Sequence, residues 1–153
     1  MAKERGFEPV KNAPADTILP KRATKHSAAH DFCLPCNVII GPKTYSEPIA
    51  LNVKAYMQGD EVLHLYIRSS LGVKKRLLLA NGTGVIDSDY YSNEDNDGNI
   101  YITLYNNGIA PVRLVKGERV AQGEFNKYLL ADGDKVTTKR KGGTGSTDKR
   151  ETK

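Results

Sequence analysis

The stretch Asn81-Gly-Thr-Gly-Val-Ile-Asp-Ser-Asp-Tyr90 is the most informative part of this chain of 153 residues. Asn-Gly is the strongest short signal for a β-hairpin, and Val85-Ile86 would anchor such a hairpin in a core. Asp87 and Asp89 then lie on a fixed ridge with Tyr90 beside them. A rigidly held carboxylate can orient and deprotonate a water molecule, and an aromatic face can pack on a sugar or a base. The alternative is a hairpin whose acidic side chains merely face solvent.

On both sides of this stretch, short apolar runs alternate with turn signals from about residue 31 to residue 128. The chain has 14 Gly, 7 Pro and no Trp, and no window shows a 3.6-residue apolar period longer than two turns. This pattern predicts an all-β fold, either a sandwich or a barrel. Following the apolar runs and turn signals, the expected strands cover approximately 36–40, 49–57, 62–67, 77–80, 100–105, 112–115 and 119–128.

The two ends of the chain differ from this central part in composition. Residues 1–26 contain three prolines among scattered charges, which favours an extended arm with one short strand at its start. From about residue 132 the chain is rich in Lys, Arg, Gly, Thr and Ser, which predicts a flexible basic arm. We therefore expect one domain over residues 1–131 and a flexible C-terminal arm over residues 132–153.

The net charge of +5 comes from the two ends. Residues 1–26 contribute +3 and residues 135–153 contribute +5, whereas residues 27–134 hold ten Lys or Arg and thirteen Asp or Glu, for −3. Basic ends around a mildly acidic body suit the binding of a few phosphates better than the following of a duplex, so the charge does not argue for a nucleic-acid partner. Neither a run of 18 apolar residues nor a signal peptide occurs, and we expect a cytoplasmic protein without membrane spans.

Two further stretches carry groups that suit phosphate binding. Arg68-Ser69-Ser70 directly follows the expected strand 62–67, so a cation and two hydroxyls would project into a loop. Taken alone, ordinary turn chemistry explains these three residues better. Arg140-Lys-Gly-Gly-Thr-Gly-Ser-Thr147 combines hydroxyl and guanidinium donors with glycines, which let backbone N–H groups converge on an anion. The alternative for this stretch is a solubilising tail.

The group His26, His30, Cys33 and Cys36 is open to two interpretations. Its spacing resembles part of a tetrahedral zinc site, but one Cys-x-x-Cys pair without a second is a weak signal. Val38-Ile39-Ile40 continues the stretch as a strand, which favours two reduced thiols packed along that strand.

Five stretches, in order, resemble the five sequence motifs of the trimeric dUTPase family, over about residues 24–147. Gly84-Val-Ile-Asp-Ser-Asp-Tyr90 matches the third motif residue for residue and is the most specific part. The first, second, fourth and fifth motifs correspond to Ser27-Ala-Ala-His-Asp31, Arg68-Ser-Ser70, Gly117-Glu-Arg-Val-Ala-Gln122 and Arg140-Lys-Gly-Gly-Thr-Gly-Ser-Thr147. The resemblance implies a jelly-roll-like β-barrel that forms a homotrimer with active sites at subunit interfaces. It also implies hydrolysis of dUTP to dUMP and pyrophosphate with Mg²⁺ as the cofactor.

The resemblance implies roles for individual residues around the nucleoside. Asp87 would hold the 3′-hydroxyl and activate the water that attacks the α-phosphorus. Tyr90 would pack on the deoxyribose and leave no room for a 2′-hydroxyl. Backbone groups of the 81–86 hairpin, including Asn81 and Gly84, would read the uracil edge and exclude cytosine.

The triphosphate and its metal ion would be held by other motifs. Asp31 would help to hold Mg²⁺ through the water molecules of the ion. The arm after residue 132 would close over the triphosphate as an ordered lid. The residues implied in phosphate binding are Arg68, Ser69, Ser70, Gln122, Arg140, Ser146 and Thr147.

The chain departs from the family pattern at several positions. Ala29 and His30 replace the usual Gly and Tyr of the first motif. Thr144 stands where the family has a Phe that stacks on uracil, and an acidic insertion at residues 93–98 follows the third motif. Asp87 and Tyr90 are intact, so we expect an active enzyme with a loosened lid.

Two rival interpretations remain. One is a regulatory protein on the same fold, which would bind a protein partner through residues 93–98 and the basic arms, because fold does not fix function. The other is an enzyme of the dCTP deaminase type. Deamination without a metal needs a carboxylic acid near the base, and the expected strand at residues 101–105 contains none.

Overall fold

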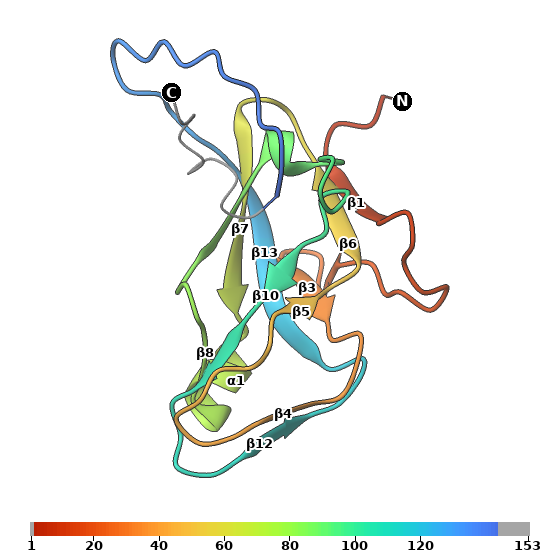
Figure 1. Cartoon of the computed structure of the whole chain (residues 1–153), viewed down its shortest axis with the longest axis vertical. Coiled ribbons are helices and arrows are strands. Elements are labelled where there is room, and N and C mark those ends of the chain that lie inside the picture. The colour runs from red at the N-terminus through yellow and green to blue at the C-terminus, as the bar shows by residue number, and fades with distance from the viewer. Residues whose placement is uncertain (1, 144–153) are drawn as a thin grey trace, which may run out of the picture.

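The computed structural model describes residues 2–143, and these residues confirm the all-β prediction (Figure 1). Short strands follow one another, interrupted within this range by one short α-helix and one 3₁₀ helix. No helix among them is both long and apolar enough to cross a membrane. In chain order the elements are β1 (Gly6–Pro9), β2 (Lys21–Arg22), β3 (His30–Cys33), β4 (Val38–Ile40), β5 (Ile49–Ala50), β6 (Val53–Tyr56), β7 (Glu61–Ile67), α1 (Ser69–Lys75), β8 (Leu77–Leu79), β9 (Gly84–Asp87), η1 (Ser88–Tyr90), β10 (Tyr101–Ile102), β11 (Leu104–Asn106), β12 (Val112–Leu114) and β13 (Arg119–Lys127).

A five-stranded antiparallel sheet in the order β2-β3-β13-β7-β9 forms the centre of the fold. β13 pairs with β3 on one side and with β7 on the other. β7 then pairs with β9, which places Val62 opposite Asp87 and Leu65 opposite Gly84. Four two-stranded pairs, β1-β6, β4-β12, β5-β10 and β8-β11, complete the strand pairing. In Figure 1, α1 and the β4-β12 pair lie at the lower end, whereas the segment after β13 returns to the upper end.

One apolar core holds these small sheets together. Leu63 in β7, Leu77 in β8 and Leu104 in β11 are fully buried members of it, although the three strands belong to two different sheets. Burial of each such side chain stabilises the fold by roughly 1.5–3 kcal/mol. Gly123 in β13 allows a close approach within the core, because a Cβ there would lie 2.9 Å from both Leu65 and Phe32. Even a methyl group at this position would displace core side chains.

The strands lie close to the expected positions, but the β-hairpin predicted at Asn81-Gly82 is wrong. β8 before the turn pairs with β11, and β9 after it pairs with β7, so the turn connects two different sheets. Gly82 does adopt a positive φ of 71°, as a tight turn requires. Four residues separate the two strands, at 80–83, and the chain changes sheets there instead of folding back on itself. Val85 is consequently 59% exposed, and of the expected anchor pair only Ile86 packs against the core.

The helix α1 was not predicted either. Ser69 and Ser70, expected in a loop, form its first turn, and Arg76 ends it in the left-handed conformation. Seven residues amount to two turns, which is too short for an amphipathic period to be recognised in the sequence.

A nearly buried ion pair joins the loop after η1 to the N-terminal part of the chain. Lys54 Nζ, on β6, lies 3.0 Å from each carboxylate oxygen of Asp97 and donates to Ser92 Oγ at the same distance. The backbone N–H of Lys11 also donates to Asp97, at 2.8 Å. The Lys54 and Asp97 side chains are only 9% and 15% exposed. Water therefore has little room to replace a lost partner.

Replacing Lys54 by Met should lower the free energy of unfolding by about 2–3 kcal/mol, because Asp97 loses its cation in a mostly buried position. The control is Lys127→Met, which removes the partner of Asp60 from a pair whose side chains are 72% and 56% exposed. This change should cost about 1 kcal/mol or less. Urea unfolding of the two variants at equal protein concentration measures the difference. Equal losses would contradict a special role for Lys54.

The same pair predicts a pH dependence. Burial alone would raise the pKa of Asp97, but the bonds from Lys11 N–H and from Lys54 lower it below its ordinary value. A carboxyl with a lowered pKa stabilises the fold above the pKa of the unfolded chain, about 3.9, and ceases to do so as the pH falls through the folded pKa. The stability difference between wild type and Lys54→Met should therefore persist at neutral pH and shrink below about pH 4. A difference independent of pH in urea titrations between pH 3 and 7 would contradict this assignment.

Candidate functional site

A large cavity adjoins the stretch that the sequence singled out. It has a volume of about 690 Å³, and its walls include Asn81, Gly84, Asp87, Tyr90 and Arg140. Gly84 fits here because a Cβ would lie only 3.0 Å from the Cβ of Leu65 on β7, so glycine lets β9 lie close to its neighbour. The structure thus brings together five of the predicted site residues. The other predicted site residues within the described range lie elsewhere in the structure.

The acidic ridge predicted at Asp87 and Asp89 is present, and Arg140 bridges its two carboxylates. Asp87 ends β9 and Asp89 lies in η1, and their carboxylates are about half exposed. The guanidinium of Arg140 contacts Asp87 through Nη2 and donates from Nε to Asp89 Oδ1 at 2.8 Å. The hydrogen bond to Asp89 raises the pKa of Arg140, although partial burial acts against it. The sequence did not predict this contact between the C-terminal segment and the ridge.

Tyr90 is fixed within the wall of the cavity. Its side chain is buried, and its hydroxyl donates to the backbone oxygen of Asn99 at 2.8 Å. The same hydroxyl accepts a hydrogen bond from Asn96 Nδ2 at 2.7 Å. Arg140 lies over the ring, with Cζ 5.8 Å from the ring centroid. Tyr90 therefore presents a rigid aromatic surface next to Asp87.

A second polar cluster surrounds Asp31. Arg68 Nε and Arg119 Nη1 each lie 3.0 Å from a different oxygen of this buried carboxylate. Gln122 faces the same group, because it is the register partner of Asp31 in the β3-β13 ladder. Arg119 was not among the predicted residues. It lies within the stretch 117–122, which resembles the fourth motif. The guanidinium of Arg119, close to Gln122 in the sequence, is itself a suitable phosphate ligand and was the signal that could have identified it.

The two clusters lie at opposite ends of β7. Asp87 pairs with Val62 near the start of this strand, whereas Arg68 follows its last residue, Ile67. Six residues of extended chain span roughly 20 Å. Figure 1 agrees, with α1 near the lower end and the segment after β13 near the upper end. The backbones of Asp87 and Arg68 therefore lie far apart within one chain.

Neither cluster forms a metal cage of its own. Both oxygens of Asp31 are taken by arginines, and the described residues contain no group of three or more His, Cys, Asp or Glu side chains suited to a metal ion. Mg²⁺ usually retains several waters and binds one or two carboxylates together with substrate phosphates. The residues present fit such an ion only as part of a nucleotide complex and do not fit a resident ion.

The cysteine group does not have the predicted arrangement. Cys33 ends β3, but Cys36 is exposed in the turn before β4, so the two thiols do not lie along one strand. Burial, followed by the charge of Asp31, raises the pKa of the Cys33 thiol, which makes it a weak ligand or nucleophile. His30 packs edge-on against Phe7, with ring centroids 5.3 Å apart, on the apolar side of β3. Ser146 and Thr147 lie outside the described residues.

Comparisons with known proteins agree on one family. The dUTPase family model matches residues 15–147 of this chain. A deoxyuridine 5′-triphosphate nucleotidohydrolase of Lactococcus lactis is 47% identical over 148 residues, which cover 95% of this chain and 98% of that protein.

Solved structures give the same result at the level of the fold. The dUTPase from Streptococcus mutans matches with a TM-score of 0.77 and 43% identity, covering 84% of this chain and 99% of that one. The dUTPase of Staphylococcus bacteriophage 80alpha with dUPNHPP has a TM-score of 0.72, covers 90% of both chains and is 20% identical, which shows a shared fold alone. These structures confirm the predicted jelly-roll-like β fold, and the chain belongs to the dUTPase family.

Proposed function

We propose that this chain hydrolyses dUTP to dUMP and pyrophosphate, with Asp87 as the base that activates the attacking water. The observation that carries the proposal is the position of Asp87, whose half-exposed carboxylate lies at a 690 Å³ cavity beside the fixed ring of Tyr90. A carboxylate in such a place can accept a proton from a water and direct it at a bound phosphate. The 47% identity to the Lactococcus lactis nucleotidohydrolase supports the substrate.

The uracil ring is read by the open edge of β9. This strand is the last one of its sheet, so within residues 2–143 its edge away from β7 has no strand partner. Unpaired N–H and C=O groups on a strand edge are ready to bond an extended partner. Gly84 and Val85 of this strand line the cavity, as does Asn81 in the turn before it. The pattern of donors and acceptors on uracil suits such an edge, and cytosine would place an amino group against a donor.

The triphosphate is bound by the cluster around Asp31, from a neighbouring subunit. Arg68 and Arg119 are the cations of that cluster, and Ser69, Ser70 and Gln122 add neutral donors beside them. The separation of roughly 20 Å along β7 supports a shared site, because Asp87 and Arg68 of one chain lie far apart for one nucleotide to contact both. A homotrimer with active sites between subunits satisfies this constraint, since a closed ring repeats one interface three times.

The substrate is the Mg²⁺ complex of dUTP, in which the metal ion neutralises part of the phosphate charge. Asp31 would contact this ion only through water, because both of its oxygens bind arginines. Arg140 would leave Asp87 and Asp89 for the phosphates when the nucleotide binds. This exchange frees the Asp87 carboxylate to act as a base at the moment when the substrate is in place.

The alternatives receive less support. The insertion at 93–98 was the expected contact surface of a regulatory protein, but Asn93, Asn96 and Asp97 direct their side chains to partners in the same chain. Binding of a protein partner through this region stays a prediction. The strand region 101–105 presents no acid for a deaminase, as the sequence indicated.

Replacing Asp87 by Asn should lower the rate of pyrophosphate release from dUTP by at least about a hundredfold, because an amide cannot accept the proton. The matched control is Asp89→Asn, which removes the other partner of Arg140 and should change the rate by about fivefold at most. Wild-type protein should prefer dUTP over dCTP, dTTP and UTP in the same assay. A folded Asp87→Asn variant with wild-type turnover would remove Asp87 from the mechanism.

The shared site predicts complementation between two inactive variants. Asp87→Asn and Arg68→Ala should each be inactive as pure proteins, but their mixed trimers, made by co-refolding, should regain activity. With random assembly, about one site in four combines an intact Asp87 from one chain with an intact Arg68 from another. Recovery of about a quarter of the wild-type rate is expected. Complete absence of recovery, with mixed trimers shown by mass spectrometry, would place both residues in a site within one chain.

A further inference from the structure

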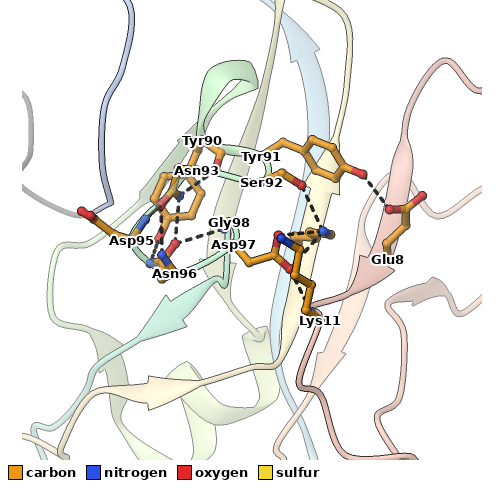
Figure 2. Close-up of polar contacts among 11 residues, drawn as sticks. Glu8, Lys11, Tyr90, Tyr91, Ser92, Asn93, Asp95, Asn96, Asp97 and Gly98 are labelled. Atoms are coloured by element: carbon orange, nitrogen blue, oxygen red, sulfur yellow. Dashed lines mark hydrogen bonds and ion pairs between the residues drawn. The ribbon is translucent and has the colours of Figure 1, made fainter.

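The loop between Tyr90 and Gly98 has a fixed conformation with two different sides (Figure 2). Ser92, Asp97 and Gly98 all adopt a positive φ, between 52° and 78°. A Cβ at Gly98 would lie 2.7 Å from the backbone nitrogen of Ser92, so no other residue fits without moving the loop. In Figure 2, Asn93 and Asn96 lie on the side of Tyr90, whereas Asp97 points to the N-terminal segment.

The hydrogen bonds of Asn96 determine which way its amide points. Its Oδ1 accepts from the backbone N–H of Gly98 at 3.1 Å and from Asn93 Nδ2 at 2.8 Å. A backbone N–H can only donate, so the side-chain oxygen must face it. Nδ2 is therefore on the opposite side, where it donates to the Tyr90 hydroxyl at 2.7 Å.

The Tyr90 hydroxyl is consequently saturated in one orientation. It must donate to the Asn99 carbonyl, which only accepts, and it uses its own oxygen to accept from Asn96. Asn93 holds the other end of the residue, because its Nδ2 donates to the Tyr90 backbone oxygen at 2.8 Å. The loop thus fixes both the ring and the backbone of a residue in the wall of the cavity.

We propose that Asn96 is a positioning residue for Tyr90 and, through it, a determinant of the preference for deoxyribose over ribose. This inference rests on the proposed function and on the role that the family resemblance implies for Tyr90, whose ring would leave no room for a 2′-hydroxyl. A single oxygen atom separates the two sugars, so the discrimination depends on a ring that cannot move back. Asn96 supplies the donor that holds the ring from the loop side.

The loop itself is anchored at a distance from the cavity. Asp97 bonds Lys54 and the backbone of Lys11, and the Tyr91 hydroxyl donates to Glu8 at 2.7 Å (Figure 2). These contacts fix the loop to β1 and β6 from behind. Loss of the Asn96 donor should therefore loosen the Tyr90 ring, which keeps its bond to the Asn99 carbonyl, while the loop backbone stays in place.

Asn96 also lies beside the C-terminal segment, and the test must separate this effect. A Cβ on Gly143 would lie 3.0 Å from Asn96 Nδ2, and the Gly143 N–H donates to Asp95 at 2.8 Å. A change at Asn96 could act on catalysis through this segment without involving Tyr90. The Tyr90 hydroxyl distinguishes the two routes, because only one of them passes through it.

The experiment compares kcat/KM for dUTP and UTP in wild type and in Asn96→Ala. The ratio of the two values should fall about three- to tenfold, the effect of one neutral hydrogen bond, mainly through a gain in UTP hydrolysis. Glu94→Gln is the control, since Glu94 is an exposed acid in the same loop, and its ratio should equal that of wild type. Asn96→Asp is the second variant. It keeps an oxygen for Gly98 N–H and lacks the donor, so it should lower the ratio as well even if Asn96→Ala folds poorly.

A double-mutant cycle with Tyr90→Phe supplies the decisive readout. Phe removes the hydroxyl, so adding Asn96→Ala to Tyr90→Phe should change the dUTP to UTP ratio by less than about twofold. An unchanged ratio in both Asn96 variants, or a full effect of Asn96→Ala in the Tyr90→Phe background, would overturn the inference. Absence of dUTP turnover by the wild-type protein would instead overturn the proposed function, so the two failures are distinguishable.

Discussion

The antiparallel pairing of β7 with β13 and β9 is the constraint on which the rest of this structure depends. β7 is an interior strand of the sheet, and its two neighbours carry Gln122 and Asp87 at opposite ends. The register therefore decides where each functional group lies. A shift of one residue would turn Asp87 away from its face of the sheet, since side chains alternate along a strand. The core packing of Leu63 and Leu65 excludes such a shift.

In both polar clusters, carboxylates are paired with arginines. Asp31 is held between two arginines, and Arg140 lies between Asp87 and Asp89. The carboxylates of both clusters are thus already paired with arginines before a nucleotide arrives. In the proposed function, binding of a triphosphate would have the character of an exchange, in which Arg140 would move from carboxylate to phosphate oxygens. The guanidinium group suits such an exchange because its planar fork fits both kinds of anion.

The sequence predicted the fold class, most strand positions and the residues around the cavity, because these depend on local patterns. Alternating apolar residues reveal strands such as β7. Asp87 and Tyr90 are close neighbours in the sequence, so a short motif is enough to identify both. The pairing of strands is not local, so the sequence suggested a hairpin at Asn81-Gly82 where the chain changes sheets.

Long-range contacts were missed for the same reason. Arg140 lies 53 residues after Asp87, and Arg119 lies 88 residues after Asp31, and no periodicity relates such positions. The insertion at 93–98 was expected to be an acidic surface. From its sequence alone, Asp97 was expected to be an exposed charge. In the structure its side chain is mostly buried and pairs with Lys54. Only the three-dimensional arrangement shows which acids of a loop face inward.

The anchoring of this loop has a consequence for protein engineering. Its conformation needs Gly98, two non-glycine residues with positive φ, and partners in two other segments, one from Glu8 to Lys11 and one around Lys54. Such a loop is not a portable module. Grafting the loop onto another scaffold would require the paired strands β1 and β6 as well. Shortening the loop by a single residue would break the turn at Asn93 that supports Tyr90. The loop can therefore be exchanged only together with the strand segments that anchor it.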